Sequence, residues 1–266
     1  MNPEGNGVGE VGATVPTEGA APRRVAIVAL GPSNLRYIQQ ASNLGSRAHY
    51  DEVWTVNSYA DVIKSDRLFH MDDFLVQERR AEKNPRIAAM LEAIKRYPGP
   101  VITCRPLPRY PTSIEYPLGP VIAAFQQCYF NNTVPYMAAY AGYIGVEEVT
   151  FFGCDYSWPN RVSAEKGRAC LEYWIGQLNA RGVRTQICQE STLMDAQEYR
   201  NHVYPIYGYC DAHTVQLIPM DDHRIKMIIT PKEELPTAEE MEAKYDHGQD
   251  DTPGHEIDVI AGPVAG

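Results

Sequence analysis

A histidine and three aspartates in this sequence have the chemistry of a catalytic or metal-binding site. His70 lies near the end of one apolar segment, which Asp72 and Asp73 follow, and Asp155 follows another. Alternate side chains of an extended chain point to the same side, so Asp72 can orient His70 as a general base. Alternatively, Asp72 and Asp73 hold Mg²⁺, which prefers oxygen ligands, or an aspartate caps the next helix. We expect His70, Asp72 and Asp155 to be catalytic, with Asp72 and Asp73 as candidate metal ligands.

Other polar residues and glycines at the ends of apolar segments could bind a ligand. Gly31 lets a ligand approach the backbone, and Pro32 suits the first position of a helix whose N-terminus favours anions. An asparagine after a buried strand, such as Asn57, either contacts a ligand or caps the next turn. The candidate ligand-binding residues are Gly31, Pro32, Ser33, Asn34, Asn57, Asn132, Thr133, Gly153 and Tyr156.

Apolar segments of strand length alternate with helical segments in the middle of the chain, and these elements would position the polar residues. The expected strands are 24–30, 52–57, 67–71, 100–104, 148–152 and 183–187. The expected helices are 33–44, 75–97, 133–144 and 164–181, with a proline-rich irregular loop at 105–120. This alternation predicts an α/β fold with a doubly wound, mostly parallel, Rossmann-like sheet and helices on both faces. Ligands bind such sheets at the carboxyl ends of the strands.

Composition divides the chain into three parts. Residues 1–22 hold three acidic and no basic residues, and residues 231–266 hold ten acidic and two basic residues. We therefore expect a disordered N-terminal arm over 1–22, a single α/β domain over 23–230, and an acidic, largely disordered tail over 231–266. The net charge of −10 comes almost entirely from these two ends.

The composition also argues against several classes of protein. No apolar run reaches the roughly 18 residues that a membrane span needs, and the N-terminus lacks the pattern of a secretory signal. The six cysteines form no Cys-x-x-Cys pair, which favours reduced thiols in a cytoplasmic protein. The nearly neutral middle lacks the strong basic footprint of a nucleic-acid-binding protein. The tyrosine-rich segment 199–213 could be a surface for homo-oligomerisation.

Taken in order, the strand-end motifs resemble one family group. It comprises the sialyltransferase-like proteins, the 6-hydroxymethylpterin diphosphokinase-like proteins and the motility-associated glycosyltransferase-like proteins. The resemblance covers about residues 24–195 and rests on Gly31-Pro32-Ser33, Asn57, Asn131-Asn132-Thr133, Ile144-Gly145 and Gly153-Cys154-Asp155-Tyr156. Two departures from the sialyltransferases are a short loop without histidine after Tyr156 and the absence of a Ser-Gly before the helix at 133–144.

The resemblance implies a transferase that uses a nucleotide-activated donor of CMP or UDP type and transfers a glycosyl group to a hydroxyl. One alternative is diphosphate transfer from ATP, with Mg²⁺ held by Asp72 and Asp73. Another alternative is a protein that binds a nucleotide without catalysis. All three share a small nucleotide ligand in a pocket at the strand ends.

Overall fold

A seven-stranded, fully parallel sheet forms the centre of the first of two compact units, Met1–Gln197 and Glu198–Gly266. The computed structural model describes residues 21–44, 49–196, 213–219 and 225–231. The expected arm, the acidic tail beyond 231 and nearly all of segment 199–213 lie outside these residues. In the second unit, β8 (His213–Pro219) and β9 (Ile225–Pro231) pair as an antiparallel hairpin. The first unit ends before residue 230, where we expected the domain to end.

The strands of the sheet are arranged in the order β5-β4-β3-β2-β1-β6-β7. Their bounds are Arg24–Val28 for β1, Glu52–Val56 for β2, Arg67–His70 for β3, Val101–Thr103 for β4, Ser113–Glu115 for β5, Glu148–Phe152 for β6 and Arg184–Ile187 for β7. The chain builds outward from β1 to β5, then returns to the other side of β1 for β6 and β7. The strand order therefore reverses between β1 and β6.

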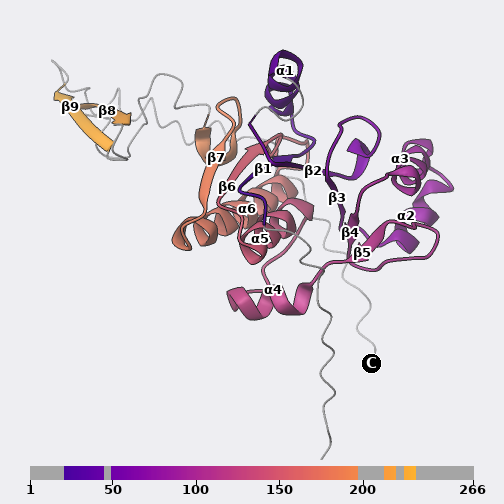
Figure 1. Ribbon diagram of the computed structural model, residues 1–266. Helices are drawn as coiled ribbons and strands as arrows, with labels where there is room; N and C mark the ends of the chain where they lie inside the picture. The colour runs from indigo at the N-terminus through magenta and orange to yellow at the C-terminus, as the bar shows by residue number, and fades with distance from the viewer. Residues whose placement is uncertain (1–20, 45–48, 197–212, 220–224, 232–266) are drawn as a thin grey trace, which may run out of the picture. The chain divides into compact units, whose positions relative to one another are not determined.

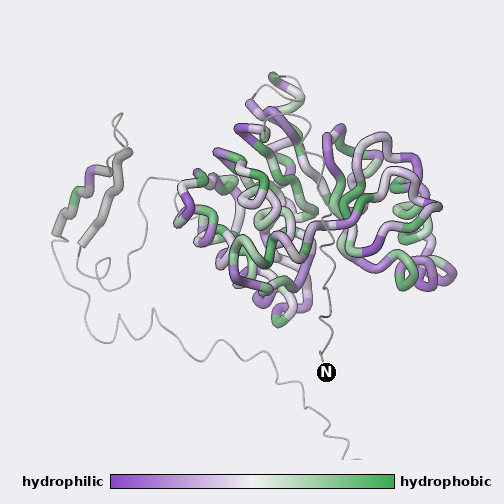
Figure 2. Tube along the Cα trace, turned by 60° about the horizontal axis from the view of Figure 1, so that its bottom comes forward, coloured by the Kyte–Doolittle hydropathy of each residue, from purple (hydrophilic) through white to green (hydrophobic). Residues whose placement is uncertain are grey.

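The central strands are buried on both faces, as their continuous apolar sequences predict. Val25, Ile27 and Val28 of β1 have no exposed surface, and the strands run through the hydrophobic interior of this unit (Figure 2). In the register of the sheet, Ile27 lies between Trp54 of β2 and Phe151 of β6. This arrangement confirms the predicted doubly wound α/β class.

Helices cover both faces of the sheet (Figure 1). On one face, α4 (Leu118–Phe125), α5 (Thr133–Ile144) and α6 (Arg161–Ala180) pack on a large apolar cluster that includes Ile27 and Phe151. On the other face, α1 (Asn34–Leu44) packs through Tyr37 against Val28. Next to it, α2 (Phe74–Ala81) and α3 (Pro85–Arg96) cover β3 and β4.

Two sequence-based boundaries were wrong. The helix expected over 75–97 is divided into α2 and α3, because Asn84 caps a new helix by accepting a hydrogen bond from the Arg86 N–H (3.1 Å). Pro85 then occupies the first turn, where its missing N–H costs nothing. The loop expected over 105–120 contains the short strand β5 and the start of α4.

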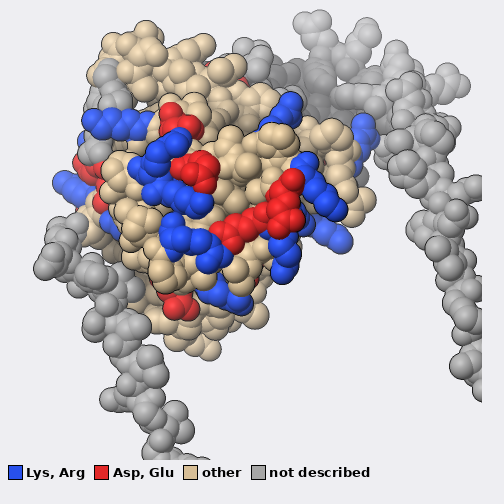
Figure 3. Space-filling view, turned by 90° about the vertical axis from the view of Figure 1, so that its right-hand side faces the viewer, with Lys and Arg blue, Asp and Glu red and all other residues tan. Residues whose placement is uncertain are grey.

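The surface over α2 and α3 carries charges of both signs. Figure 3 shows Lys and Arg side chains with Asp and Glu among them on this side of the protein. Glu78 pairs with Arg109, and Lys95 pairs with Glu92 at 2.5 Å. Among the residues that the structure describes, no helix has both the length and the apolar character needed to span a bilayer.

Candidate functional site

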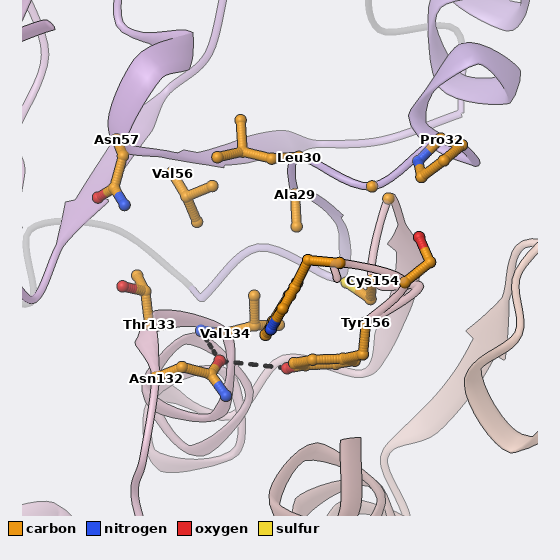
Figure 4. Close-up of a pocket in the computed structure, with 14 residues that line it drawn as sticks. Ala29, Leu30, Pro32, Val56, Asn57, Asn132, Thr133, Val134, Cys154 and Tyr156 are labelled. Carbon is orange, nitrogen blue, oxygen red and sulfur yellow. Dashed lines mark hydrogen bonds between the residues drawn. The ribbon is translucent and has the colours of Figure 1, made fainter. Parts of the chain in front are cut away.

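A cavity of about 380 Å³ opens at the carboxyl ends of β1, β2 and β6. It lies where the strand order reverses, the place at which open α/β sheets bind ligands. The loops after these three strands and the N-terminus of α5 form its wall (Figure 4). The lining residues are Ala29, Leu30, Gly31, Pro32, Val56, Asn57, Asn132, Thr133, Val134, Gly153, Cys154, Tyr156, Ser157 and Trp158.

Two glycines bring the loops after β1 and β6 together on one side of the cavity. The Gly31 N–H donates to the Gly153 carbonyl (2.7 Å), and the Gly153 N–H donates to Ser33 Oγ (2.9 Å). A Cβ at Gly31 would lie against Asp155 Oδ2, and a Cβ at Gly153 would overlap the Ala29 carbonyl. Gly153 also has a φ of 66°, in the region that favours glycine. Gly31 is therefore needed by the fold itself and not only for the approach of a ligand.

Asp155 binds the start of α1 and does not line the cavity. Its Oδ2 accepts a hydrogen bond from the Ser33 N–H (2.7 Å), just before the helix begins at Asn34. The side chain is 4% exposed, and Oδ1 has no hydrogen-bond partner among the described residues. A carboxylate at a helix N-terminus satisfies free N–H groups and complements the helix dipole. The structure thus gives Asp155 the helix-cap contact that the sequence offered as the alternative to a catalytic role.

Tyr156 is held in an unusual backbone conformation at the base of the cavity. Its φ is 50°, a strained value for a bulky side chain, and such strain gathers at functional sites. The Tyr156 hydroxyl donates to Asn132 Oδ1 (3.1 Å) (Figure 4). Its ring lies against α6 at Gly167, where a Cβ would be only 2.5 Å from Tyr156 Cε1. Burial raises the pKa of the Tyr156 hydroxyl, so it remains protonated and available as a donor.

The N-terminus of α5 opens onto the cavity, as the sequence predicts for Asn132 and Thr133. Asn132 is the cap, since its Oδ1 accepts from the Val134 N–H (3.2 Å), and Thr133 and Val134 line the wall. Backbone N–H groups in the first turn of a helix favour a negatively charged group. This end of the cavity is therefore suited to a phosphate.

Asn57 and His70 contact each other at the ends of the adjacent strands β2 and β3. Asn57 has a φ of 40° and lines the cavity, and its Oδ1 lies 2.9 Å from His70 Nδ1. His70 is completely buried and does not line the cavity. Burial lowers the pKa of His70 from 6.5 to about 4, although the charge of Asp72 acts in the opposite direction. The sequence had suggested that Asp72 orients this ring, and in the structure Asn57 binds it instead.

The two predicted metal ligands, Asp72 and Asp73, have different surroundings. Asp72 is exposed, whereas Asp73 caps α2 by accepting from the Leu75 N–H (2.8 Å) and lies 3.6 Å from Arg105 Nη1. Among the described residues, no group of three or more His, Cys, Asp or Glu side chains could hold a metal ion. The residues present do not fit the Mg²⁺ site that the sequence suggested.

Most of the predicted ligand-binding residues do line the cavity, and two lie behind it. Ser33 is buried as the acceptor for Gly153, and Asn34 donates to the Tyr59 hydroxyl. The sequence analysis missed the other seven lining residues, which are Ala29, Leu30, Val56, Val134, Cys154, Ser157 and Trp158. For Trp158 a signal was available, namely a tryptophan in the loop after the strand 148–152, two residues beyond Tyr156; in the structure it is 43% exposed. The aliphatic residues continue apolar strands and carry no such signal.

The fold and the cavity define a doubly wound α/β protein with a cavity at the reversal of strand order. No protein-family model matches the chain, and no curated protein matches it. Among solved structures, it is similar to the sialyltransferase CstII from Campylobacter jejuni in complex with a substrate analogue, CMP-3FNeuAc. The identity is 16%, over 84% of this chain and 98% of that chain, with a TM-score of 0.40. It is also similar to the monofunctional α-2,3-sialyltransferase Cst-I from C. jejuni, at 14% identity over 85% of this chain and 93% of that chain, with a TM-score of 0.40.

Proposed function

We propose that the protein is a glycosyltransferase-like transferase that takes a nucleotide-activated donor and transfers its glycosyl group to a hydroxyl. The observation that carries the proposal is the cavity at the reversal of strand order, into which the N-terminus of α5 opens. A volume of about 380 Å³ lies within the range of small-molecule sites. The donor in this proposal is of CMP or UDP type.

The chemistry of the wall suits the parts of such a donor. Aromatic and aliphatic side chains, including Tyr156, Trp158 and Val134, can contact a planar base or a sugar face. The amide of Asn57 can bind a hydroxyl or a carbonyl group. The N–H groups at the start of α5 can stabilise the phosphate as it leaves with the nucleotide, which is the charge that develops during transfer.

Transfer to a hydroxyl also needs a group that accepts its proton. Of the three residues that the sequence suggested for catalysis, His70 is buried against Asn57 and Asp155 binds the start of α1. Asp72 does not line the cavity either, but it is exposed and has no structural role assigned to it, and it follows β3 at the same edge of the sheet as the cavity. We keep Asp72 as the proposed base on these grounds.

Nucleotide binding without turnover is the second candidate function. It is favoured by the observation that His70 and Asp155 each form a hydrogen bond within the fold. A structural role therefore accounts for both residues without catalysis. The ATP-dependent alternative has less support, because Asp73 is engaged by Leu75 and Arg105 rather than facing the cavity.

Calorimetric titration of the full chain tests the proposal. CMP, UDP and ATP are each titrated with and without Mg²⁺, and donor cleavage is then followed by chromatography with CMP- and UDP-sugars. We expect CMP or UDP to bind without Mg²⁺, and its sugar donor to be cleaved. Lys83→Ala, on the surface over α2 and α3, is the matched control and should behave as the parent protein. Binding without cleavage of any donor would favour the second candidate, and no binding of any nucleotide would contradict both.

A further inference from the structure

Asn57 lines the cavity, and its side chain is held by His70, which lies outside the cavity. β2 and β3 are parallel, with Val56 opposite Phe69, so the next residues, Asn57 and His70, emerge side by side. The 2.9 Å contact joins Asn57 Oδ1 to His70 Nδ1. A carboxamide oxygen only accepts hydrogen bonds, so in this orientation of the amide His70 Nδ1 is the donor and carries the proton. The Asn57 Nδ2 group is then left as the donor on the cavity side.

The imidazole ring of His70 is itself immobilised. It has no exposed surface and stacks on Phe74, with ring centroids 4.8 Å apart and an interplanar angle of 29°. Phe74 in turn stacks on Tyr110 at 3.7 Å and 11°. Phe74 is the first residue of α2, which Asp73 caps. The orientation of the ring is therefore set by the packing of α2 against the end of β3.

An unrestrained asparagine amide can turn over and exchange its donor for its acceptor. At Asn57 the exchange would place two amide hydrogens against the Nδ1 proton of His70. The clash is relieved only if that proton moves to Nε2, which is buried and has no hydrogen-bond partner among the described residues, so the pair resists the exchange. The backbone also restricts Asn57, because its φ of 40° sets the direction in which the side chain leaves the end of β2.

We infer that His70 is a positioning residue, which selects the ligand chemistry of the cavity by holding Asn57 with its NH₂ group toward the ligand. The inference rests on the proposed nucleotide site. It predicts that the Asn57 NH₂ group donates a hydrogen bond to an acceptor of the ligand, such as a base carbonyl or a ribose oxygen. His70 acts through Asn57 and contacts no ligand itself.

Two substitutions separate the hydrogen bond from simple packing. His70→Phe keeps a ring that can stack on Phe74 and removes the donor to Asn57. His70→Asn removes the ring, and its own NH₂ group can replace the Nδ1 donor. In calorimetric titrations with CMP, we expect His70→Phe to weaken binding by about three- to tenfold, the effect of one hydrogen bond, and His70→Asn to restore most of it. If His70→Phe binds CMP as tightly as the parent protein, or His70→Asn binds more weakly than His70→Phe, the inference is wrong.

A double substitution tests whether His70 acts through Asn57. On an Asn57→Ala background, His70→Phe should have no further effect on CMP affinity, since the residue that it positions is gone. An additive loss would overturn the inference in favour of a general structural role. Thermal unfolding of all variants shows which of them remain folded.

The proton on Nδ1 gives a readout that needs no ligand. In ¹⁵N spectra of histidine-labelled protein near neutral pH, the His70 signal is identified by its absence from the spectrum of His70→Asn. We expect this signal to be that of a neutral ring protonated at Nδ1. A ring protonated at Nε2 would overturn the inference whether or not the protein binds nucleotides. If the parent protein shows the Nδ1 form but binds no CMP, UDP or ATP, the proposed function fails and the geometry of the pair stands.

Discussion

Gly31 and Gly153 lie so close that their loops form one continuous wall, with the Gly31 N–H 2.7 Å from the Gly153 carbonyl. The contact joins the ends of β1 and β6, the two strands between which the chain reverses direction across the sheet. It also places Asp155, two residues after Gly153, against the start of α1. The site and the fold therefore depend on the same few residues.

The first prediction concerns Gly31. Gly31→Val should lower the Tm by many degrees, because its Cβ would be driven against Asp155 Oδ2 and would disturb the cap of α1. Losses of about 1–3 kcal/mol are typical of overpacking, and the lost cap adds to this. Calorimetric unfolding measures the effect. The control is Gly119→Ala in α4, where a Cβ meets nothing within 4 Å. An unchanged Tm for Gly31→Val would show that the two loops can separate.

The second prediction concerns the support of Tyr156 by α6. Gly167→Ala should weaken nucleotide binding by about tenfold or more, because the added methyl group occupies the space of the Tyr156 ring. Gly176→Ala on the same helix has no neighbour within 4 Å and should bind normally, with a slight gain in stability of about 0.5–1 kcal/mol. Equal affinities for the two variants would mean that Tyr156 does not contact the ligand.

The third prediction is a pH dependence of stability due to His70. Burial lowers its pKa to about 4 in the folded protein, against 6.5 for an unperturbed histidine. Between these values the unfolded chain binds more protons, so the free energy of unfolding falls as the pH drops from about 6.5 toward 4. A shift of this size corresponds to a few kcal/mol over the whole window. Denaturant unfolding at several pH values measures it.

The variant His70→Asn isolates this contribution from that of the acidic residues. At position 70 it has no group that titrates in this window, so its stability should fall less steeply with decreasing pH than that of the parent protein. Parallel curves for the two proteins would contradict the assignment of the effect to His70.

The fourth prediction concerns Asp72. Asp72→Asn should lower the rate of glycosyl transfer by about 10²–10⁴-fold, the usual contribution of a general base, with little change in Tm because the side chain is exposed. Asp73→Ala is the contrasting variant. It should cost about 1 kcal/mol of stability through loss of the α2 cap and leave turnover nearly intact. Full activity of Asp72→Asn would remove this residue from the mechanism.

The strands and the strand-end residues were the parts of this protein that sequence could predict. Continuous apolar runs such as 24–30 require burial on both sides, and parallel strands gather their polar ends at one edge. Thus Gly31, Asn57, Thr133 and Gly153 do line one cavity. The break between α2 and α3 was readable in principle, because Asn84-Pro85 is a helix start, but the charge pattern on either side of it concealed the signal.

The roles of the ionisable residues could not be predicted in the same way. A carboxylate after a strand caps a helix or faces a ligand depending on where the next helix starts, and that depends on tertiary packing. Asp155 turned toward Ser33 because α1 begins beside it, and His70 became buried because Phe74 covers it. Apolar lining residues such as Val56 belong to strands, and only the three-dimensional arrangement shows that they also face a cavity.

Trp158 allows nucleotide binding in the cavity to be observed by fluorescence. Of the three tryptophans, Trp54 and Trp174 have no exposed surface, whereas Trp158 is 43% exposed and lines the cavity. Fluorescence of the full chain is titrated with CMP and UDP, with Trp158→Phe as the control for quenching elsewhere. We expect a saturable change in the parent protein that is lost in Trp158→Phe, although calorimetry still detects binding in that variant. A nucleotide that binds by calorimetry and leaves the Trp158 fluorescence unchanged, or that binds not at all, would contradict a nucleotide site in this cavity.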